Sequence, residues 1–214
     1  MNLFTYPSYE ERHERLNTLT HVYGAIFFAI GGIYLLWECK FLKAHLFMPI
    51  SFYVMALITM FIVSSIYHAT RQPERKRIWQ IVDHCCIFLL IGGTYVPVIM
   101  RYIKNDTGSV FLTSMWTIII TGIFLKIFFT GKYTLLSTIV YVCLGWMGLF
   151  IIQPLIETVP NPTLSLFGLG GVLYTIGVYF YRNEKITYNH TIWHFFVLGG
   201  AAAHYGAMLQ LISY

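Results

Sequence analysis

Residues 47–70, FMPISFYVMALITMFIVSSIYHAT, decide the fold class of this chain. The stretch is 24 residues long and contains no Asp, Glu, Lys or Arg, and a basic segment at 71–77 follows it directly. An α-helix needs about 20 predominantly apolar residues to cross the hydrocarbon core of a bilayer. Residues 47–70 therefore predict a transmembrane helix that ends at a membrane surface.

The composition of the whole chain agrees with this prediction. Apolar residues make up 57% and charged residues 11% of the 214 residues, whereas soluble domains carry about 25% charged residues. The formal net charge of +5 arises from basic residues that lie singly or in small clusters between apolar runs. We interpret these residues as membrane-surface anchors and topology signals, so the composition argues against a nucleic-acid partner.

Seven windows are long and apolar enough to span a bilayer: 19–37, 47–70, 78–100, 110–129, 135–155, 164–181 and 187–212. The short breaks between these windows hold nearly all of the charged residues. Connections of this length force neighbouring helices to run antiparallel in one bundle. We therefore expect an all-α, polytopic membrane protein with a single seven-helix transmembrane domain that covers residues 1–214.

The basic residues predict the orientation of the bundle. With the N-terminus in the cytoplasm, ten of the 14 lysines and arginines lie on the cytoplasmic side and four lie outside. Cytoplasmic loops of membrane proteins carry an excess of Lys and Arg. The sequence therefore predicts that residues 1–17 form a cytoplasmic N-terminal segment.

Ionisable side chains inside a span are costly and are therefore candidates for function. Eight of them lie in or at the edge of the predicted spans: His21, His68, Asp83, His84, Lys126, His190, His194 and His204. The end of the second span and the starts of the third and seventh meet at the cytoplasmic leaflet of an antiparallel bundle. His68, Asp83, His190 and His194 lie in those places. The sequence therefore predicts one polar site at that leaflet.

The spacing of the histidines indicates a metal site. His190 and His194 are four residues apart, so their imidazoles share one face of a helix. With His68 as a third donor they make up the three-histidine set of open catalytic zinc sites. Asp83 would hold or deprotonate a water there, and Ser64 lies one turn before His68 on the same helix face. Imidazole donors also suit other metals, so the spacing alone does not select zinc.

Two of the polar residues have further interpretations. Asp83 alone is also typical of a proton-relay carboxylate in a transporter. His204 lies about 15 Å deeper than His194, at 1.5 Å per residue, and we interpret it as a packed histidine hydrogen-bonded between helices.

Four motifs resemble those of the bacterial hemolysin III family, within the wider group of the progestin and adiponectin receptors and the alkaline ceramidases. They are Glu14-x-x-Asn17-x-x-x-His21, Ser64-x-x-x-His68, Asp83 and His190-x-x-x-His194. The resemblance covers essentially the whole chain, and the motifs follow in the expected order on the expected helices. It implies a seven-helix bundle with a cytoplasmic N-terminus in the bacterial plasma membrane.

The resemblance also implies a site and a chemistry. It implies a zinc ion on His68, His190 and His194, with Ser64 and Asp83 beside the water on the zinc. The alkaline ceramidases are zinc amidases that act on lipids, and a hydrolase activity has been proposed for the receptors. The family name implies cytolysis, whereas this chain is too apolar to travel through water as a secreted pore-former does.

Three functional hypotheses follow. The first is a zinc-dependent hydrolase of a lipid amide or ester, in which Asp83 accepts a proton and Ser64 steadies the oxyanion. The second is a non-enzymatic membrane receptor or regulator, in which structural zinc ties the second span to the seventh. The third is a transporter, channel or cytolytic pore. In each case we expect membrane lipids as partners, and in the first a lipid-like substrate.

Overall fold

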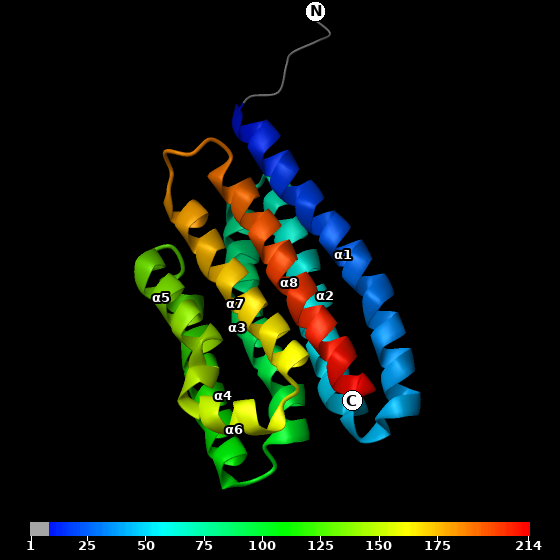
Figure 1. The fold of residues 1–214 in the computed structure, drawn as a ribbon. Coiled ribbons are helices and arrows are strands. Elements are labelled where there is room, and N and C mark those ends of the chain that lie inside the picture. Colours follow the sequence, from blue (N-terminus) through cyan, green and yellow to red (C-terminus); the bar gives the residue numbers. More distant parts are fainter. Residues whose placement is uncertain (1–8) are drawn as a thin grey trace, which may run out of the picture.

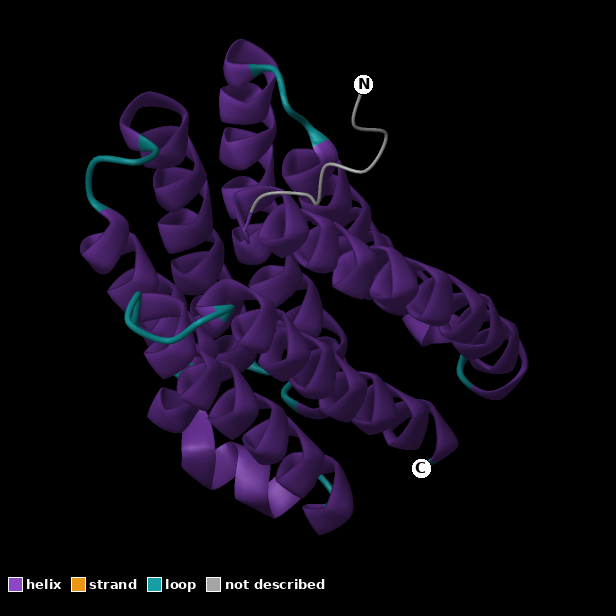
Figure 2. Cartoon of the chain, turned by 90° about the horizontal axis from the view of Figure 1, so that it is seen from above, coloured by secondary structure: helices purple, strands orange, loops and turns teal. Residues whose placement is uncertain are grey.

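A computed structural model describes residues 9–214, and residues 1–8 lie outside the described part. The regular secondary structure of the described residues is entirely helical, and the connecting loops are short (Figure 2). The elements follow in the order α1 (Tyr9–Leu42), η1 (Ala44–Leu46), α2 (Phe47–Ala69), α3 (Pro73–Tyr102), α4 (Asp106–Phe129), α5 (Thr134–Gly145), η2 (Met147–Ile151), α6 (Ile152–Thr158), α7 (Asn161–Arg182) and α8 (Asn189–Ser213). The predicted all-α fold class is confirmed.

Seven segments of the described chain are long and apolar enough to cross a membrane. α5, η2 and α6 together make up the fifth of them, Thr134–Thr158. Consecutive spans run in opposite directions and form one bundle (Figure 1). The structure therefore confirms the prediction of a polytopic seven-helix membrane protein.

The outer surface of the bundle is apolar. Large hydrophobic side chains point outward with high exposure, among them Ile33 at 71%, Met48 at 76% and Phe150 at 87%. Contiguous apolar surfaces of this extent are rare on soluble monomers and are the normal surface of a protein surrounded by lipid. Exposed hydrophobic residues therefore mark the lipid-facing side of the helices.

Helices α7 and α8 pack along most of their length, and glycines allow their close approach. A Cβ atom at Gly200 of α8 would lie 2.8 Å from the ring of Tyr174 on α7. Small residues at helix interfaces permit this kind of packing in membranes, where dispersion contacts replace the hydrophobic effect as the driving force.

Helix α1 extends further than its predicted window. It begins at Tyr9, so most of the predicted N-terminal segment, residues 1–17, is part of the first helix, and the remainder lies outside the described residues. Its first turns carry Glu14 and Asn17, whose side chains hydrogen-bond to α2 and α8. The helix continues through a polar stretch because these polar groups find partners on neighbouring helices.

The fifth span is broken near its middle, although the sequence predicts one continuous window at 135–155. α5 ends at Gly145, and η2 leads the chain into α6. The Tyr95 hydroxyl of α3 donates a hydrogen bond to the Gly145 carbonyl at 2.6 Å and accepts one from the Gly148 amide at 2.9 Å. A side chain from another helix thus satisfies backbone groups at the break, which makes an irregular backbone tolerable in a membrane.

We expect Tyr95→Phe to destabilise the protein by about 1–3 kcal/mol, because the change leaves the Gly145 carbonyl and the Gly148 amide without this partner. The measurement is the free energy of unfolding in mixed detergent micelles. Tyr23→Phe is the matched control, since Tyr23 lies on α1 with 69% of its surface exposed. Equal stability of the two variants would show that the break does not depend on Tyr95.

Candidate metal centre

Three histidines come together at one end of the bundle. His68 lies in the last turn of α2, and His190 and His194 lie in the first two turns of α8. One ring nitrogen of each lies within 4.8 Å of the others. The ring centroids are 4.9 Å apart for His68 and His190, 5.0 Å for His68 and His194, and 4.7 Å for His190 and His194. We call this nearly equilateral group the histidine cluster, and the end of the bundle that contains it the histidine end.

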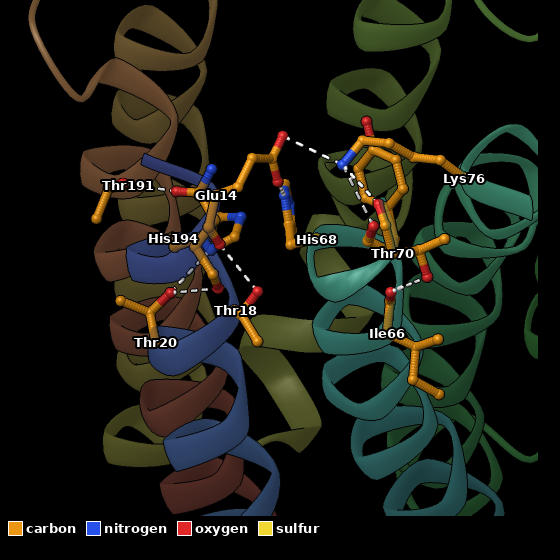
Figure 3. A network of polar contacts seen from close by, with 11 residues as sticks. Glu14, Thr18, Thr20, Ile66, His68, Thr70, Lys76, Thr191 and His194 are labelled. Carbon is orange, nitrogen blue, oxygen red and sulfur yellow. Dashed lines mark hydrogen bonds and ion pairs between the residues drawn. The ribbon is translucent and has the colours of Figure 1, made fainter. Parts of the chain in front are cut away.

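A carboxylate fixes the ring of His68. Its Nδ1 lies 2.7 Å from Oε2 of Glu14 on α1, and Oε1 of Glu14 lies 3.2 Å from Nζ of Lys76 on α3 (Figure 3). Because a carboxylate accepts this hydrogen bond, His68 carries a proton on Nδ1. Its Nε2 is buried and has no hydrogen-bond partner in the described part of the chain. The lone pair of Nε2 is therefore available to a cation in the cluster.

A threonine fixes the ring of His194 with its proton on Nδ1, as the carboxylate does for His68. The Thr20 hydroxyl of α1 lies 2.9 Å from Nδ1 of His194 and donates its hydrogen to the Asn17 carbonyl at 2.9 Å. The hydroxyl has one hydrogen, so it accepts the hydrogen bond from His194, which places the proton of His194 on Nδ1. The Asn17 side chain in turn accepts a hydrogen bond from Thr191 of α8 at 2.5 Å. His194 therefore also keeps Nε2 for a ligand.

The polar face of α1 is the part of the site that sequence reasoning missed. Glu14 and Asn17 belong to the motif Glu14-x-x-Asn17-x-x-x-His21, but the sequence alone predicts no role for either of them or for Thr20. The available signal was their spacing, since Glu14, Asn17 and His21 recur at intervals of three and four residues and so share one helix face. That face lies against the histidine cluster.

Ser64 and Asp83 lie beside the cluster. Ser64 is buried on α2, one turn before His68, and Asp83 lies on α3, which packs against α2. Both residues line the same cavity as His190 and His194. The structure therefore brings the five residues predicted for the site to one end of the bundle.

Three further intramembrane histidines, His21, His84 and His204, lie outside the cluster. His21 stacks on His194 with ring centroids 3.7 Å apart, and both of its nitrogens are buried without a hydrogen-bond partner in the described residues. His204 lies further along α8, where its Nε2 is 3.2 Å from the Phe167 carbonyl on α7. The interpretation of His204 as an interhelical hydrogen-bonding residue is confirmed.

Two cavities meet at the histidine cluster. The first, the apolar cavity, has a volume of about 350 Å³, and its lining on α3 runs from Asp83 to Val98, a rise of roughly 22 Å at 1.5 Å per residue. The second, the polar cavity, has a volume of about 320 Å³, and its lining includes His68, Glu14 and Arg182. His190 lines both. The cluster therefore lies between an elongated apolar space and a polar one.

The donor set fits a metal ion. It consists of three imidazoles, and in two of them a hydrogen bond to Nδ1 leaves Nε2 as the donor atom. A hydrogen bond to the outer nitrogen of each ligating histidine is the usual arrangement in protein metal sites, because it fixes the tautomer and the ring orientation. Three histidines leave a coordination position open for a water or a substrate.

The fold and the site define a class of protein, a seven-span integral membrane protein with a buried three-histidine cluster at one end of the bundle. The family model described as haemolysin-III related matches residues 9–205. This chain therefore belongs to the haemolysin-III related family, and it is a multi-pass protein of the bacterial membrane.

Individual relatives agree with this assignment. The chain is 33% identical to a hemolysin-3 homolog of Bacillus subtilis over 199 residues, which cover 92% of this chain and 93% of the relative. It is 34% identical to hemolysin-3 of Bacillus cereus, with 92% and 91% covered. A human protein named monocyte to macrophage differentiation factor is 26% identical over 168 residues, which cover 75% of this chain and 68% of that protein.

We expect purified protein to hold one metal ion per chain, and His190→Ala and His194→Ala to lose it, because each change removes one of three nitrogen donors. Elemental mass spectrometry of detergent-purified protein measures the content. His45→Ala is the matched control, since His45 is exposed in η1. Metal retained in both cluster variants would place the ion elsewhere.

We expect Glu14→Gln to weaken metal binding by about 10- to 100-fold, because the amide no longer supplies the negative charge that faces Nδ1 of His68. Titration with a competing chelator measures the affinity. Glu10→Gln, an exposed carboxylate near the start of the same helix, is the control. An affinity equal to that of the control would show that Glu14 does not tune the site.

Proposed function

We propose that this protein is a zinc-dependent hydrolase that cleaves an amide or ester bond of a membrane lipid. The observation that carries the proposal is the histidine cluster beside Ser64 and Asp83 at the polar end of the elongated apolar cavity. Zinc on three neutral nitrogens keeps its full charge, and when bound it supplies the Lewis acid that activates water and polarises a carbonyl.

The residues of the chain supply the proton transfers. Asp83 accepts a proton from the attacking water as the new carbon–oxygen bond forms at the lipid carbonyl. The same proton then passes to the departing nitrogen or oxygen as the amide or ester bond breaks, so the products are a fatty acid and an amine or alcohol. The Ser64 hydroxyl lies in the same cavity as Asp83. When a carbonyl is bound, that hydroxyl turns to donate a hydrogen bond to the developing oxyanion.

The shape of the apolar cavity supports a lipid substrate. Polar side chains gather at the histidine end, while the far part is lined mainly by apolar residues such as Leu90, Val98 and Leu155. An amphiphile with one long chain matches this distribution, with its chain among the apolar residues and its head group at the cluster. The polar cavity on the other side of His190 provides a route for water, and the excess of basic residues at this end supports a position at the cytoplasmic surface.

A second candidate function is a non-enzymatic receptor or regulator in which the metal is structural. The cluster connects α2 to α8, and its hydrogen bonds add α1, so an ion there would clasp three helices. A metal in this arrangement would stabilise the bundle without catalysing a reaction. The two functions differ in the role of Asp83, which the receptor does not need as a base.

We expect Asp83→Asn to lower the rate of lipid hydrolysis by about 10²- to 10⁴-fold with metal content unchanged, because the amide cannot accept the proton. The assay follows release of fatty acid from a panel of N-acyl and O-acyl lipids. Asp106→Asn, an exposed carboxylate at the start of α4, is the control. Full turnover by Asp83→Asn contradicts the mechanism. Absence of turnover in the metal-loaded wild type, with lowered stability after metal removal, favours the receptor.

A further inference from the structure

Lys126 is a buried lysine that the mechanism does not use. It lies in the last turn of α4, with only 6% of its surface exposed, and it lines the apolar cavity. Among the described residues that line this cavity it is the only lysine or arginine. A charged side chain inside a transmembrane bundle is costly, and residues of this kind are usually retained for a ligand, an ion or a proton.

No acidic partner balances Lys126 in the described structure. The ion pairs of the described residues involve Glu11 and Glu14, and none of them includes Lys126. The closest compensation is the Tyr141 ring of α5, whose centroid lies 5.7 Å from Nζ. A cation–π contact contributes about 0.5–2 kcal/mol, whereas removing an ion from water costs several kcal/mol.

Two hydroxyl groups that line the same cavity already use their hydrogens and are not free donors. Ser137 and Thr138 of α5 line the same cavity, but each donates its hydrogen to a backbone carbonyl one turn earlier in its own helix. The Tyr141 hydroxyl donates to the His84 carbonyl at 3.0 Å, which fixes the ring beside Lys126. The ammonium group is therefore the strongest free hydrogen-bond donor on this wall of the cavity.

Lys126 lies at the histidine end, close to the proposed reaction site. It comes from the last turn of α4, which ends at the same end of the bundle as α2 (Figure 1). His84 of α3 is near enough to interact electrostatically with both Lys126 and His68. Lys126 lines the same cavity as His190 and His194, so a head group at the histidine cluster shares that cavity with a buried positive charge that lacks a counter-ion in the described structure.

We infer that Lys126 binds a negatively charged group of the lipid, so the cavity selects single-chain amphiphiles whose head carries a carboxylate or a phosphate. This inference rests on the proposed hydrolase function and names its substrate class, an acyl chain joined through an amide or ester to an acidic head. An anion at Lys126 supplies the missing counter-ion, and the hydrogen bond between the two charged groups forms away from water, where it is strongest.

The test uses probes that the proposed reaction cannot cleave, so binding is measured apart from turnover. Oleate carries a carboxylate, oleyl phosphate carries a phosphate, and oleyl alcohol has the same chain without a charge. Their affinities for metal-loaded protein in detergent are determined by displacement of a fluorescent fatty alcohol. We expect one or both anions to bind at least tenfold more tightly than the alcohol, and the stronger of the two identifies the head group.

The variant that decides the role of the charge is Lys126→Met, which keeps an unbranched apolar side chain as far as Cε and removes the ammonium group. We expect it to remove the tenfold preference for the anion and to leave the affinity for oleyl alcohol within about twofold, while Lys126→Arg restores the preference. The matched control is Lys132→Met, which changes an exposed lysine beyond the end of α4. We expect this control to keep the tenfold preference for the anion.

Three results would overturn the inference. The first is an anion preference that Lys126→Met leaves intact. The second is an anion preference that disappears when a chelator removes the metal, since the ion would then be the group that binds the anion. The third is an equal loss of alcohol binding in Lys126→Met. If the anion preference depends on Lys126 but no lipid is hydrolysed, the binding site stands and the hydrolase proposal fails. If neutral and acidic lipids are hydrolysed equally, the hydrolase proposal stands and the inference about Lys126 fails.

Discussion

The hydrogen bonds from α1 to the histidines of α2 and α8 are the interactions on which the site depends. Glu14 binds Nδ1 of His68 and Thr20 binds Nδ1 of His194, so both rings keep Nε2 as the nitrogen with a lone pair. In a lipid environment a polar side chain has no water as an alternative partner, so it must be satisfied within the protein. One polar helix face therefore both joins three helices and selects the tautomers that a metal ion requires.

Much of this arrangement could be predicted from the sequence, because a membrane permits few alternatives. Apolar windows of sufficient length have to span, short loops make neighbouring spans antiparallel, and antiparallel order brings His68 and His194 to one end. The break at Gly145 could not be predicted, since it depends on the hydroxyl of Tyr95, which is 50 residues away in the sequence. The hydrogen bond by which Thr20 orients the ring of His194 could not be predicted either, because the two residues are 174 positions apart in the sequence.

The interior of the bundle combines a polar and an apolar environment in one cavity. Asp83 and the histidine cluster lie at one end of a cavity whose far part is lined mainly by apolar side chains. The broken fifth span contributes to this geometry, since α5, η2 and α6 all supply residues to the wall. A continuous helix with its own hydrogen-bond pattern would not present the same side chains to the cavity.

Because the two cavities meet at His190, the products of the proposed reaction would have two separate exits. In the proposed hydrolysis, cleavage at the cluster would yield one fragment that prefers hydrocarbon and one that prefers water, and a space suited to each adjoins His190. The two fragments would then leave along different paths, so neither would have to pass the other. Under the proposed function, the acyl chain would return to the bilayer and the head group would leave through the polar cavity.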